Sequence, residues 1–510
     1  MANYIMMMGT SSHVGKSILA TAMCRILYRK GRKVVPFKAQ NMALNSYVTR
    51  DGDEMGRAQV AQAEAAGMEP MVDMNPVLLK PTGNAASQVI IMGKPVGNMS
   101  AREYHRGYSL KAFDAVKEAL GRLDKEYDTI VIEGAGSPAE INLKANDIVN
   151  MRVAKYLQAP VLLIADIDRG GALASLVGTL ELLDEEERAL VKGLVINKFR
   201  GDVTLLTPAI DFLEKKTGKP VLGVVPHIDQ MGIDDEDSVS LEEKQAVPTD
   251  GDVRIAVIQT PKISNFTDFD ALAHEKDVAL YYVKAVEDLG EPDVIMLPGS
   301  KNTTEDMLYL GKSGLGEKIL AHAKAGKAVI GICGGYQMLG EVIRDPQHTE
   351  SQNDEAAGLG LLGMETVFAS EKLTSQVVAQ CQDLYFMGRS ISADNLQGYE
   401  IHMGHTAFTR EADKHPFTVC QRRGKACASQ EGTANAAGNV FGTYIHGVFD
   451  NDVFRRSVLN AIRHSKGLEA LANTRNVMAE KQQAYEHLAD VVENALDMEK
   501  LYQIMGEKTC

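Results

Sequence analysis

The sequence lacks several features that would place it in a particular class of protein. It contains no tryptophan, and its six cysteines show no CxxC pair or other metal-binding spacing. A disulfide framework is therefore not indicated, and we expect reduced thiols in a cytosolic enzyme. The cysteines are Cys24, Cys333, Cys381, Cys420, Cys427 and Cys510.

Long apolar runs and an excess of positive charge are also missing. No run is long enough to cross a bilayer, and no basic and apolar leader precedes the first predicted strand. The 54 Lys and Arg residues against 68 Asp and Glu residues give a formal net charge of −14, which argues against non-specific binding to nucleic acid or membrane surfaces. We expect a cytoplasmic protein with no nucleic-acid or membrane partner, and the sequence does not determine its oligomeric state.

Short apolar runs alternate with helical spacing over the first half of the chain. With 510 residues, the chain is long enough for two or more domains. Continuous apolar strands between helices predict a doubly wound parallel sheet, with ligands at the carboxyl ends of its strands. The expected strands are residues 4–8, 34–37, 129–132, 161–164, 194–196 and 221–225.

A second α/β series follows, with expected strands at residues 254–258, 294–297, 328–332 and 440–444. The stretch between the two series is acidic and turn-rich, which indicates a linker. The chain ends in a charged segment with an amphipathic helical pattern. The sequence thus predicts an α/β protein of two domains, residues 1–233 and 253–465, with an acidic linker at 234–252 and a C-terminal helical tail at 466–510.

A phosphate-binding loop (P-loop) is the strongest motif of the first domain. Residues 9–17 (GTSSHVGKS) join the first predicted strand to a helical stretch, which is the context that such a loop requires. Backbone N–H groups would surround an anion, Lys16 would reach the terminal phosphates, and the Ser17 hydroxyl would ligate Mg²⁺. The expected ATP-binding residues of this loop are Gly9, Thr10, Gly15, Lys16 and Ser17.

Further polar residues of the first domain are candidates for the same site. Glu133 ends a predicted apolar strand, where a carboxylate can hold the Mg²⁺ on nucleotide phosphates. Asp51 lies in an acidic turn, and we weigh a second metal ligand against a solvated turn. Asn197 follows another strand, and contact with an adenine edge is weighed evenly against a capped strand end.

An amide-rich stretch lies at residues 38–46 (KAQNMALNS). Amides orient a polar substrate through neutral hydrogen bonds. We therefore expect Asn41, Asn45 and Ser46 to bind substrate.

A nucleophile elbow with cysteine in place of serine is the central motif of the second domain. Residues 331–337 (GICGGYQ) end a predicted strand, so a sharp turn would expose the Cys333 thiol, and the following helix N-terminus favours the thiolate. The N–H of Gly334 is placed to stabilise an oxyanion, and Gly299, after another strand, is a candidate second donor. A buried cysteine without reactivity is the alternative, and glycines on both sides of Cys333 argue against it.

A cysteine nucleophile needs a base, and His446 is our choice because it follows a strand end. His402 and His405 are the competing candidates.

These motifs carry a resemblance to known families. Residues 331–337 and 444–449 resemble the cobalamin-pathway branch of the class I, triad-type glutamine amidotransferases. Residues 9–17, 129–136 and 195–198 resemble the dethiobiotin-synthetase-like ATPases. The order of the two domains, with residues 41–46, 51–59 and 74–80, is similar to the cobyric acid synthase family.

The resemblance implies a reaction and its participants. A glutamine-hydrolysing amide ligase would use ATP, Mg²⁺ and glutamine to amidate the b, d, e and g carboxylates of the corrinoid adenosylcobyrinic acid a,c-diamide, which gives adenosylcobyric acid. Cys333 would be the nucleophile, His446 the proton carrier, and Gln337 a contact of the bound glutamine. Class I enzymes carry a glutamate two residues after the histidine, but here that residue is Val448, so the partner that orients His446 is not identified.

Three alternatives remain open from the sequence. The nearest is an amidotransferase of the cobyrinic acid a,c-diamide synthase type. The others are a P-loop switch ATPase without synthetase activity, and a cysteine hydrolase with an inert P-loop.

Overall fold

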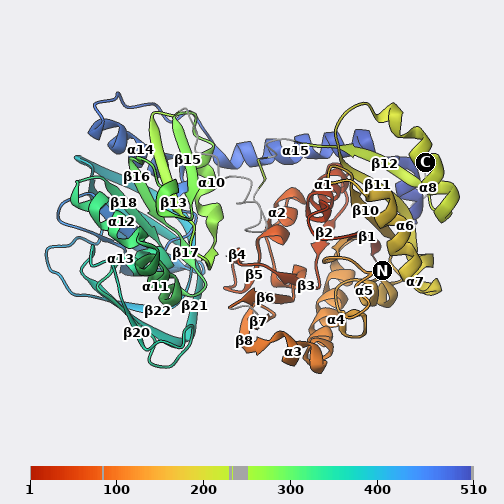
Figure 1. The fold of residues 1–510 in the computed structure, drawn as a ribbon, viewed down its shortest axis with the longest axis horizontal. Coiled ribbons are helices and arrows are strands. Elements are labelled where there is room, and N and C mark those ends of the chain that lie inside the picture. Colours follow the sequence, from red (N-terminus) through yellow and green to blue (C-terminus); the bar gives the residue numbers. More distant parts are fainter. Residues whose placement is uncertain (1, 83–85, 229–231, 234–250, 507–510) are drawn as a thin grey trace.

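The computed structural model describes residues 2–82, 86–228, 232–233 and 251–506, and the elements fall into two halves (Figure 1). Most of the expected linker at 234–252 lies outside the described residues. Among the described residues, no helix combines the length and apolar character needed to cross a membrane.

The first half is built on a six-stranded parallel sheet with the order β12-β11-β10-β1-β9-β2. Alternate residues of β1 enter two different cores: Ile5 and Met7 pack on one face of the sheet, and Met6 and Met8 on the other. The predicted doubly wound sheet is therefore confirmed. Its strands are β1 (Asn3–Gly9), β2 (Val34–Phe37), β9 (Thr129–Glu133), β10 (Val161–Asp166), β11 (Val191–Phe199) and β12 (Val221–Pro226).

Helices cover both faces of this sheet. They are α1 (Lys16–Arg29), α2 (Arg57–Ala65), α4 (Ser109–Glu126), α5 (Met151–Leu157), α6 (Ala172–Leu182), α7 (Glu185–Leu190) and α8 (Thr207–Thr217). A small sheet and a hairpin extend toward the second half (Figure 1). They comprise β3 (Gln40–Met42), β6 (Val77–Pro81), β7 (Ala86–Ile91) and β8 (Lys94–Ser100), and the pair β4 (Ser46–Val48) and β5 (Glu54–Gly56).

The second half has its own six-stranded sheet, ordered β15-β13-β16-β18-β26-β25. Its strands are β13 (Val253–Ile258), β15 (Val278–Val283), β16 (Val294–Leu297), β18 (Ala328–Ile332), β25 (Thr433–Ala434) and β26 (Val440–Thr443). The neighbouring helices are α10 (Asp270–Ala273), α11 (Thr303–Ser313), α12 (Leu315–Lys324), α13 (Gly334–Leu339) and α14 (Asp452–Ser465). A short pair, β14 (Ile263–Ser264) and β17 (Gly299–Ser300), leads into the turn of 3-10 helix η5 (Phe266–Phe269).

A second, mostly antiparallel sheet faces the first half and was not predicted. Its long strands β21 (Met364–Phe386) and β22 (Arg389–Phe408) pair with each other over most of their length. The same sheet contains β19 (Val342–Arg344), β20 (Glu355–Ala357), β23 (Phe417–Arg422) and β24 (Lys425–Glu431). Charged and polar residues along these strands interrupt the apolar alternation that would mark them in the sequence.

The C-terminal helices α15 (Val477–Ala495) and α16 (Met498–Ile504) return to the first half (Figure 1). Tyr485, Leu488 and Val492 are buried in the same core as the apolar face of α1. Arg25 of α1 also forms an ion pair with Glu486 at 2.7 Å. The C-terminal segment therefore covers one face of the first sheet.

The contact between β12 and the end of α15 can be tested at Gly223. A Cβ there would lie 2.1 Å from the backbone oxygen of Ala495, whereas a Cβ on Gly178 of α6 would meet no atom within 4 Å. Gly223→Ala should lower the free energy of unfolding by about 1–3 kcal/mol, and Gly178→Ala should raise it by about 0.5–1 kcal/mol. Thermal unfolding midpoints measure both effects, and a Gly223→Ala protein as stable as the wild type would contradict the packing described.

Candidate active sites

The loop between β1 and α1 has the geometry of a phosphate-binding loop. Gly15 adopts the left-handed conformation (φ 95°) directly before the helix, and a Cβ there would lie 2.2 Å from the side-chain nitrogen of Asn197. The Lys16 ammonium folds over the loop and donates hydrogen bonds to the carbonyl oxygens of Ser11 (2.9 Å) and Gly136 (3.3 Å). The loop amides and the lysine are thus gathered at the N-terminus of a fourteen-residue helix, where an anion is stabilised.

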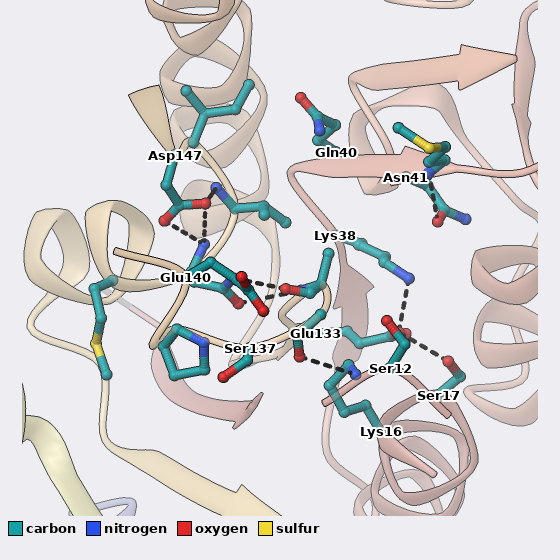
Figure 2. A pocket seen from close by; sticks show the side chains of 18 of the residues that line it. Ser12, Lys16, Ser17, Lys38, Gln40, Asn41, Glu133, Ser137, Glu140 and Asp147 are labelled. Atoms are coloured by element: carbon teal, nitrogen blue, oxygen red, sulfur yellow. Dashed lines mark hydrogen bonds and ion pairs between the residues drawn. The ribbon is translucent and has the colours of Figure 1, made fainter. Parts of the chain in front are cut away.

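Glu133, at the carboxyl end of β9, lies in the middle of this site (Figure 2). Its carboxylate is fully buried. One oxygen accepts hydrogen bonds from the Ser17 hydroxyl and the Lys38 ammonium, both at 2.8 Å. The other accepts from the side-chain amides of Gln62 (2.6 Å) and Gln59 (3.4 Å). The buried charge is therefore paired and hydrogen-bonded on both oxygens, as such a charge requires.

Ser17 and Glu133 suit a magnesium ion. Both offer oxygen, the ligand atom that this small, hard cation prefers, and the two oxygens lie 2.8 Å apart beside the phosphate loop. Asp51, the other expected ligand, is not part of this site, which corrects the expectation. It is exposed in the turn of the β4–β5 hairpin, where the adjacent Gly52 carbonyl accepts a hydrogen bond from Thr374 of the second half at 2.7 Å.

Asn197 and Thr10 hold the phosphate loop in place through hydrogen bonds. The Asn197 side-chain nitrogen donates to the Val14 carbonyl at 2.8 Å, and the Thr10 backbone N–H donates to the Ile164 carbonyl at 2.9 Å. One N–H of the Asn197 amide is thus used inside the protein, which leaves its second N–H and its oxygen for a contact with a nucleotide base.

A cleft of about 1320 Å³ opens beside the phosphate loop. Gln40 and Asn41 of β3 line it, and Figure 2 shows them across the cleft from Glu140 and Asp147. Its volume exceeds the 300–1,000 Å³ typical of a single ligand site, so it has room for a nucleotide together with a second substrate. Besides Lys16 and Lys38, five lysine or arginine side chains line this cleft: Lys144, Arg152, Lys155, Arg169 and Lys198.

The second centre is built around Cys333, between β18 and α13. Its backbone has φ 51° and ψ −107°, a strained conformation for a residue with a side chain and one that recurs at nucleophile elbows. A Cβ on Gly335 would lie 2.0 Å from the Leu297 carbonyl oxygen, and one on Gly331 would lie 2.7 Å from Gly335. The turn therefore needs these glycines in order to present the thiol.

A small cavity of about 30 Å³ lies beside the thiol and is lined by Cys333, Gln337 and His446. The expected oxyanion donors flank it: a Cβ on Gly334 would approach the Ser300 nitrogen to 2.7 Å, and one on Gly299 would approach the His446 ring to 3.3 Å. The Gln337 side chain is fixed at both ends, because its oxygen accepts from Thr303 and its nitrogen donates to Tyr444, each at 3.1 Å.

The orienting partner of His446 is Asp268, which sequence reasoning missed. One carboxylate oxygen lies 2.7 Å from Nδ1 of His446, and the other accepts the backbone N–H of Gly447 at 2.8 Å. Nε2 of His446 is buried and shares the cavity with Cys333. This is the arrangement of a Cys-His-Asp triad.

The electrostatics of the triad favour a protonated imidazole. Burial by itself lowers the pKa of His446, but the Asp268 carboxylate and the negative charge on Cys333 outweigh it and raise the pKa above its usual value. The imidazole can therefore hold a proton while it stands beside Cys333.

No local spacing points to Asp268, which lies 178 residues before His446 in the turn of η5. Val448, at the position where class I enzymes carry glutamate, is buried in the apolar core. Only the fold brings the η5 turn to the end of β26.

The competing histidines are placed differently. The His402 ring stacks on Tyr444 with centroids 3.8 Å apart, and its Nδ1 lies 2.8 Å from the Gly404 carbonyl oxygen. Desolvation lowers the pKa of His402 to about 4, so this ring is neutral. His405 is exposed on β22. Geometry therefore favours His446 as the base.

Asn45 and Ser46 are not in the cleft, which corrects their expected role in binding substrate. Both are buried against the second half of the chain. The Ser46 backbone N–H donates to the Asn265 side-chain oxygen at 3.1 Å, and the Phe266 N–H donates to the Asn45 side-chain oxygen at 3.3 Å. Asn41 alone of the three lines the cleft.

A buried ion cluster also joins the two halves. Glu54 is fully buried between Lys80 of β6 at 2.9 Å and Lys372 of β21 at 2.5 Å. Burial would raise the pKa of Glu54, but the two ammonium groups lower it far below its usual range. Lys80 and Lys372 also line the cavity beside Cys333, so residues of both halves enclose the second centre.

The fold and the two centres define a class of protein: a P-loop nucleotide-binding domain joined to a triad-type glutamine amidotransferase domain. Residues 5–238 match the family model described as the CobQ/CobB/MinD/ParA nucleotide binding domain. Residues 254–454 match that of the CobB/CobQ-like glutamine amidotransferase domain.

Whole-length relatives are more specific. The chain is 54% identical over 508 residues to a protein named cobyric acid synthase from Moorella thermoacetica, with 99% of this chain and 98% of that protein covered. It is 52% identical over 516 residues to one of the same name from Pelotomaculum thermopropionicum, with 99% and 97% covered. The chain belongs to the cobyric acid synthase family.

The role of Asp268 is tested by Asp268→Asn, which keeps the shape of the side chain and removes its charge. Glutamine hydrolysis should fall roughly 10²–10⁴-fold. Because Asp268 raises the pKa of His446, the protonated ring should be lost at a lower pH in the variant, and the alkaline limb of the pH–rate profile should move to lower pH. The exposed Asp288→Asn is the control, and an unchanged rate and profile for Asp268→Asn would contradict this role.

The ion cluster between the domains is tested by Glu54→Gln. Two buried ammonium groups would lose their counter-charge, which should cost about 3–5 kcal/mol in the free energy of unfolding. Asp53 lies next to Glu54 in the same hairpin, and Asp53→Asn breaks its more exposed ion pair with Lys94 of β8 (2.8 Å), which should cost less than about 1 kcal/mol. Chemical denaturation distinguishes the two, and equal losses would show that the buried cluster does not stabilise the interface.

Proposed function

We propose that this chain amidates the b, d, e and g carboxylates of adenosylcobyrinic acid a,c-diamide with ATP and glutamine, which yields adenosylcobyric acid. Membership of the cobyric acid synthase family supports the substrate. The observation that carries the reaction type is the presence of two different centres in one chain. A phosphate loop with Ser17 and Glu133 suits ATP, and the Cys333–His446–Asp268 set suits glutamine.

Ammonia is produced at the second centre. The Cys333 thiolate attacks the side-chain amide carbon of glutamine, and the developing oxyanion is stabilised by N–H groups around Gly334 and Gly299. His446, held by Asp268, gives its proton to the departing nitrogen, so that ammonia leaves and a glutamyl thioester remains. His446 then takes a proton from water, which attacks the thioester and releases glutamate and the thiol.

The carboxylate is activated at the first centre. A corrinoid carboxylate attacks the γ-phosphorus of ATP, which gives an acyl phosphate and ADP, and ammonia then displaces phosphate to form the amide. Lys16 and the loop amides stabilise the charge of the transferring phosphoryl group. Ser17 and Glu133 would hold Mg²⁺, whose charge neutralises the phosphate oxygens.

The large cleft of the first domain suits the proposed nucleotide and corrinoid. The cleft of about 1320 Å³ has room for a macrocycle beside the nucleotide, and Arg152, Lys155 and Arg169 offer positive charge to its peripheral carboxylates. Ammonia would be released beside Cys333, in a cavity that residues of both domains line, among them Lys80 and Lys372. Release into an enclosed cavity limits the loss of ammonia to water, where it would be protonated.

The assignment of glutamine hydrolysis to the second centre and carboxylate activation to the first is tested by a mass-spectrometric endpoint assay. The assay uses the a,c-diamide with ATP and Mg²⁺. Wild type should add four amides from either glutamine or ammonia. Cys333→Ala should lose the glutamine-dependent reaction and keep the ammonia-dependent one, while Glu133→Gln should lower both by roughly 10²-fold or more because it acts on phosphoryl transfer.

The same assay separates the alternatives. When cobyrinic acid replaces the a,c-diamide in this assay, only two added amides would indicate an a,c-diamide synthase. Glutamine hydrolysis that needs no ATP and yields no corrinoid amide would indicate a cysteine hydrolase with an inert loop. ATP hydrolysis with no amide from either donor would favour a switch ATPase.

A further inference from the structure

The hydroxyl of Tyr399 completes a closed ring of hydrogen bonds across the domain interface. It donates to the carbonyl oxygen of Ser46 in the first domain at 3.1 Å. It accepts from the side-chain nitrogen of Asn265 at 3.3 Å, and the oxygen of the same amide accepts the Ser46 N–H at 3.1 Å. Tyr399, Asn265 and Ser46 are all buried, so these bonds form away from water, where their loss is costly.

The rest of Tyr399 is in direct contact with the catalytic histidine. Its ring stacks on that of His446, with centroids 5.0 Å apart and planes inclined by 17°. The two backbones also exchange hydrogen bonds, from Tyr399 N–H to His446 oxygen (3.2 Å) and from His446 N–H to Tyr399 oxygen (2.9 Å). A shift of Tyr399 would therefore shift the imidazole.

Asn265 supports the same imidazole through the turn that carries Asp268. It begins the η5 turn in the left-handed conformation (φ 53°), and its carbonyl oxygen accepts the N–H of Asp268 at 3.1 Å. Asp268 in turn holds Nδ1 of His446. The backbone of Ser46 thus contacts both supports of the histidine, the stacked tyrosine and the turn that carries the aspartate.

We propose that Tyr399 is a positioning residue of the glutaminase centre, and that its hydroxyl ties the orientation of His446 to the docking of the first domain at Ser46. The proposal rests on the proposed function, since it concerns how the ammonia-forming half of that reaction is held. It assigns a role to Ser46 and its neighbour Asn45 other than binding substrate. The same short segment begins with Asn41, which lines the cleft of the first domain.

The experiment removes only the hydroxyl, by Tyr399→Phe, and keeps the ring that stacks on His446. Glutamine hydrolysis should lose roughly 10-fold in kcat with little change in KM, because the imidazole is less well oriented while the glutamine contacts remain. Amidation with ammonium chloride in place of glutamine should stay within about twofold of wild type, which also shows that the variant is folded.

Tyr47→Phe is the matched control. Tyr47 is the other interface tyrosine, its ring packs edge-on against Tyr399 at 5.2 Å, and its hydroxyl accepts from Gln376 across the domains at 2.9 Å. It takes no part in the hydrogen-bonded ring around Ser46. If Tyr47→Phe and Tyr399→Phe slow glutamine hydrolysis equally, the effect is a general loosening of the interface and the proposal is wrong.

A second pair of variants tests the same link from the first domain. Asn45→Leu removes the acceptor for the Phe266 N–H at the start of η5, whereas Asn45→Asp keeps an oxygen there. We expect Asn45→Leu to slow glutamine hydrolysis without slowing the ammonia-dependent reaction, and Asn45→Asp to restore it. A wild-type protein that forms no amide from either donor would overturn the proposed function itself. An active wild type with fully active Tyr399→Phe and Asn45→Leu would overturn only this inference.

Discussion

The ion pair between Asp268 and His446 is the interaction on which the second centre depends. Nδ1 of a histidine that faces a carboxylate carries the proton, which leaves Nε2 directed at the thiol and raises the affinity of the ring for a second proton. A buried imidazole without this carboxylate would be neutral, because burial disfavours its charge. The strained backbone of Cys333 exposes the thiol, and the thiol needs a base beside it. The elbow and the ion pair are therefore required together.

That ion pair lies at the boundary between the domains, and this location links the two chemistries. Asp268 stands in a turn that Asn45 and Ser46 of the first domain contact, and His446 is stacked on a tyrosine that bonds to the same segment. The buried Glu54 cluster closes the same interface. Residues of both domains therefore enclose the glutaminase centre.

Much of the fold and of the two centres could be predicted from the sequence. The parts that could not be predicted share one physical reason. The phosphate loop, Glu133 and the Cys333 elbow each lie within one strand–turn–helix segment, so their geometry is encoded by neighbouring residues. Asp268 and Tyr399 act through contacts between segments far apart in the chain, and no spacing reveals them. Polarity alone suggests Asn45 as a substrate contact and Asp51 as a metal ligand. Polar side chains, however, occur in domain interfaces and exposed turns as readily as in ligand sites. The sequence does not predict the long strands β21 and β22, because charged and polar residues interrupt their apolar alternation.

The most direct test of the account is the protonation state of the histidines, read from ¹⁵N chemical shifts of the imidazole nitrogens in histidine-labelled protein at pH 8. His446 and His402 are assigned by substitution, and His402 serves as an internal reference because its pKa is lowered to about 4. We predict an imidazolium at His446, with both ring nitrogens protonated, and a neutral ring at His402 in the same spectrum. A neutral His446 at pH 8, titrating near the ordinary histidine value of about 6.5, would contradict the claim that Asp268 sets its charge and orientation.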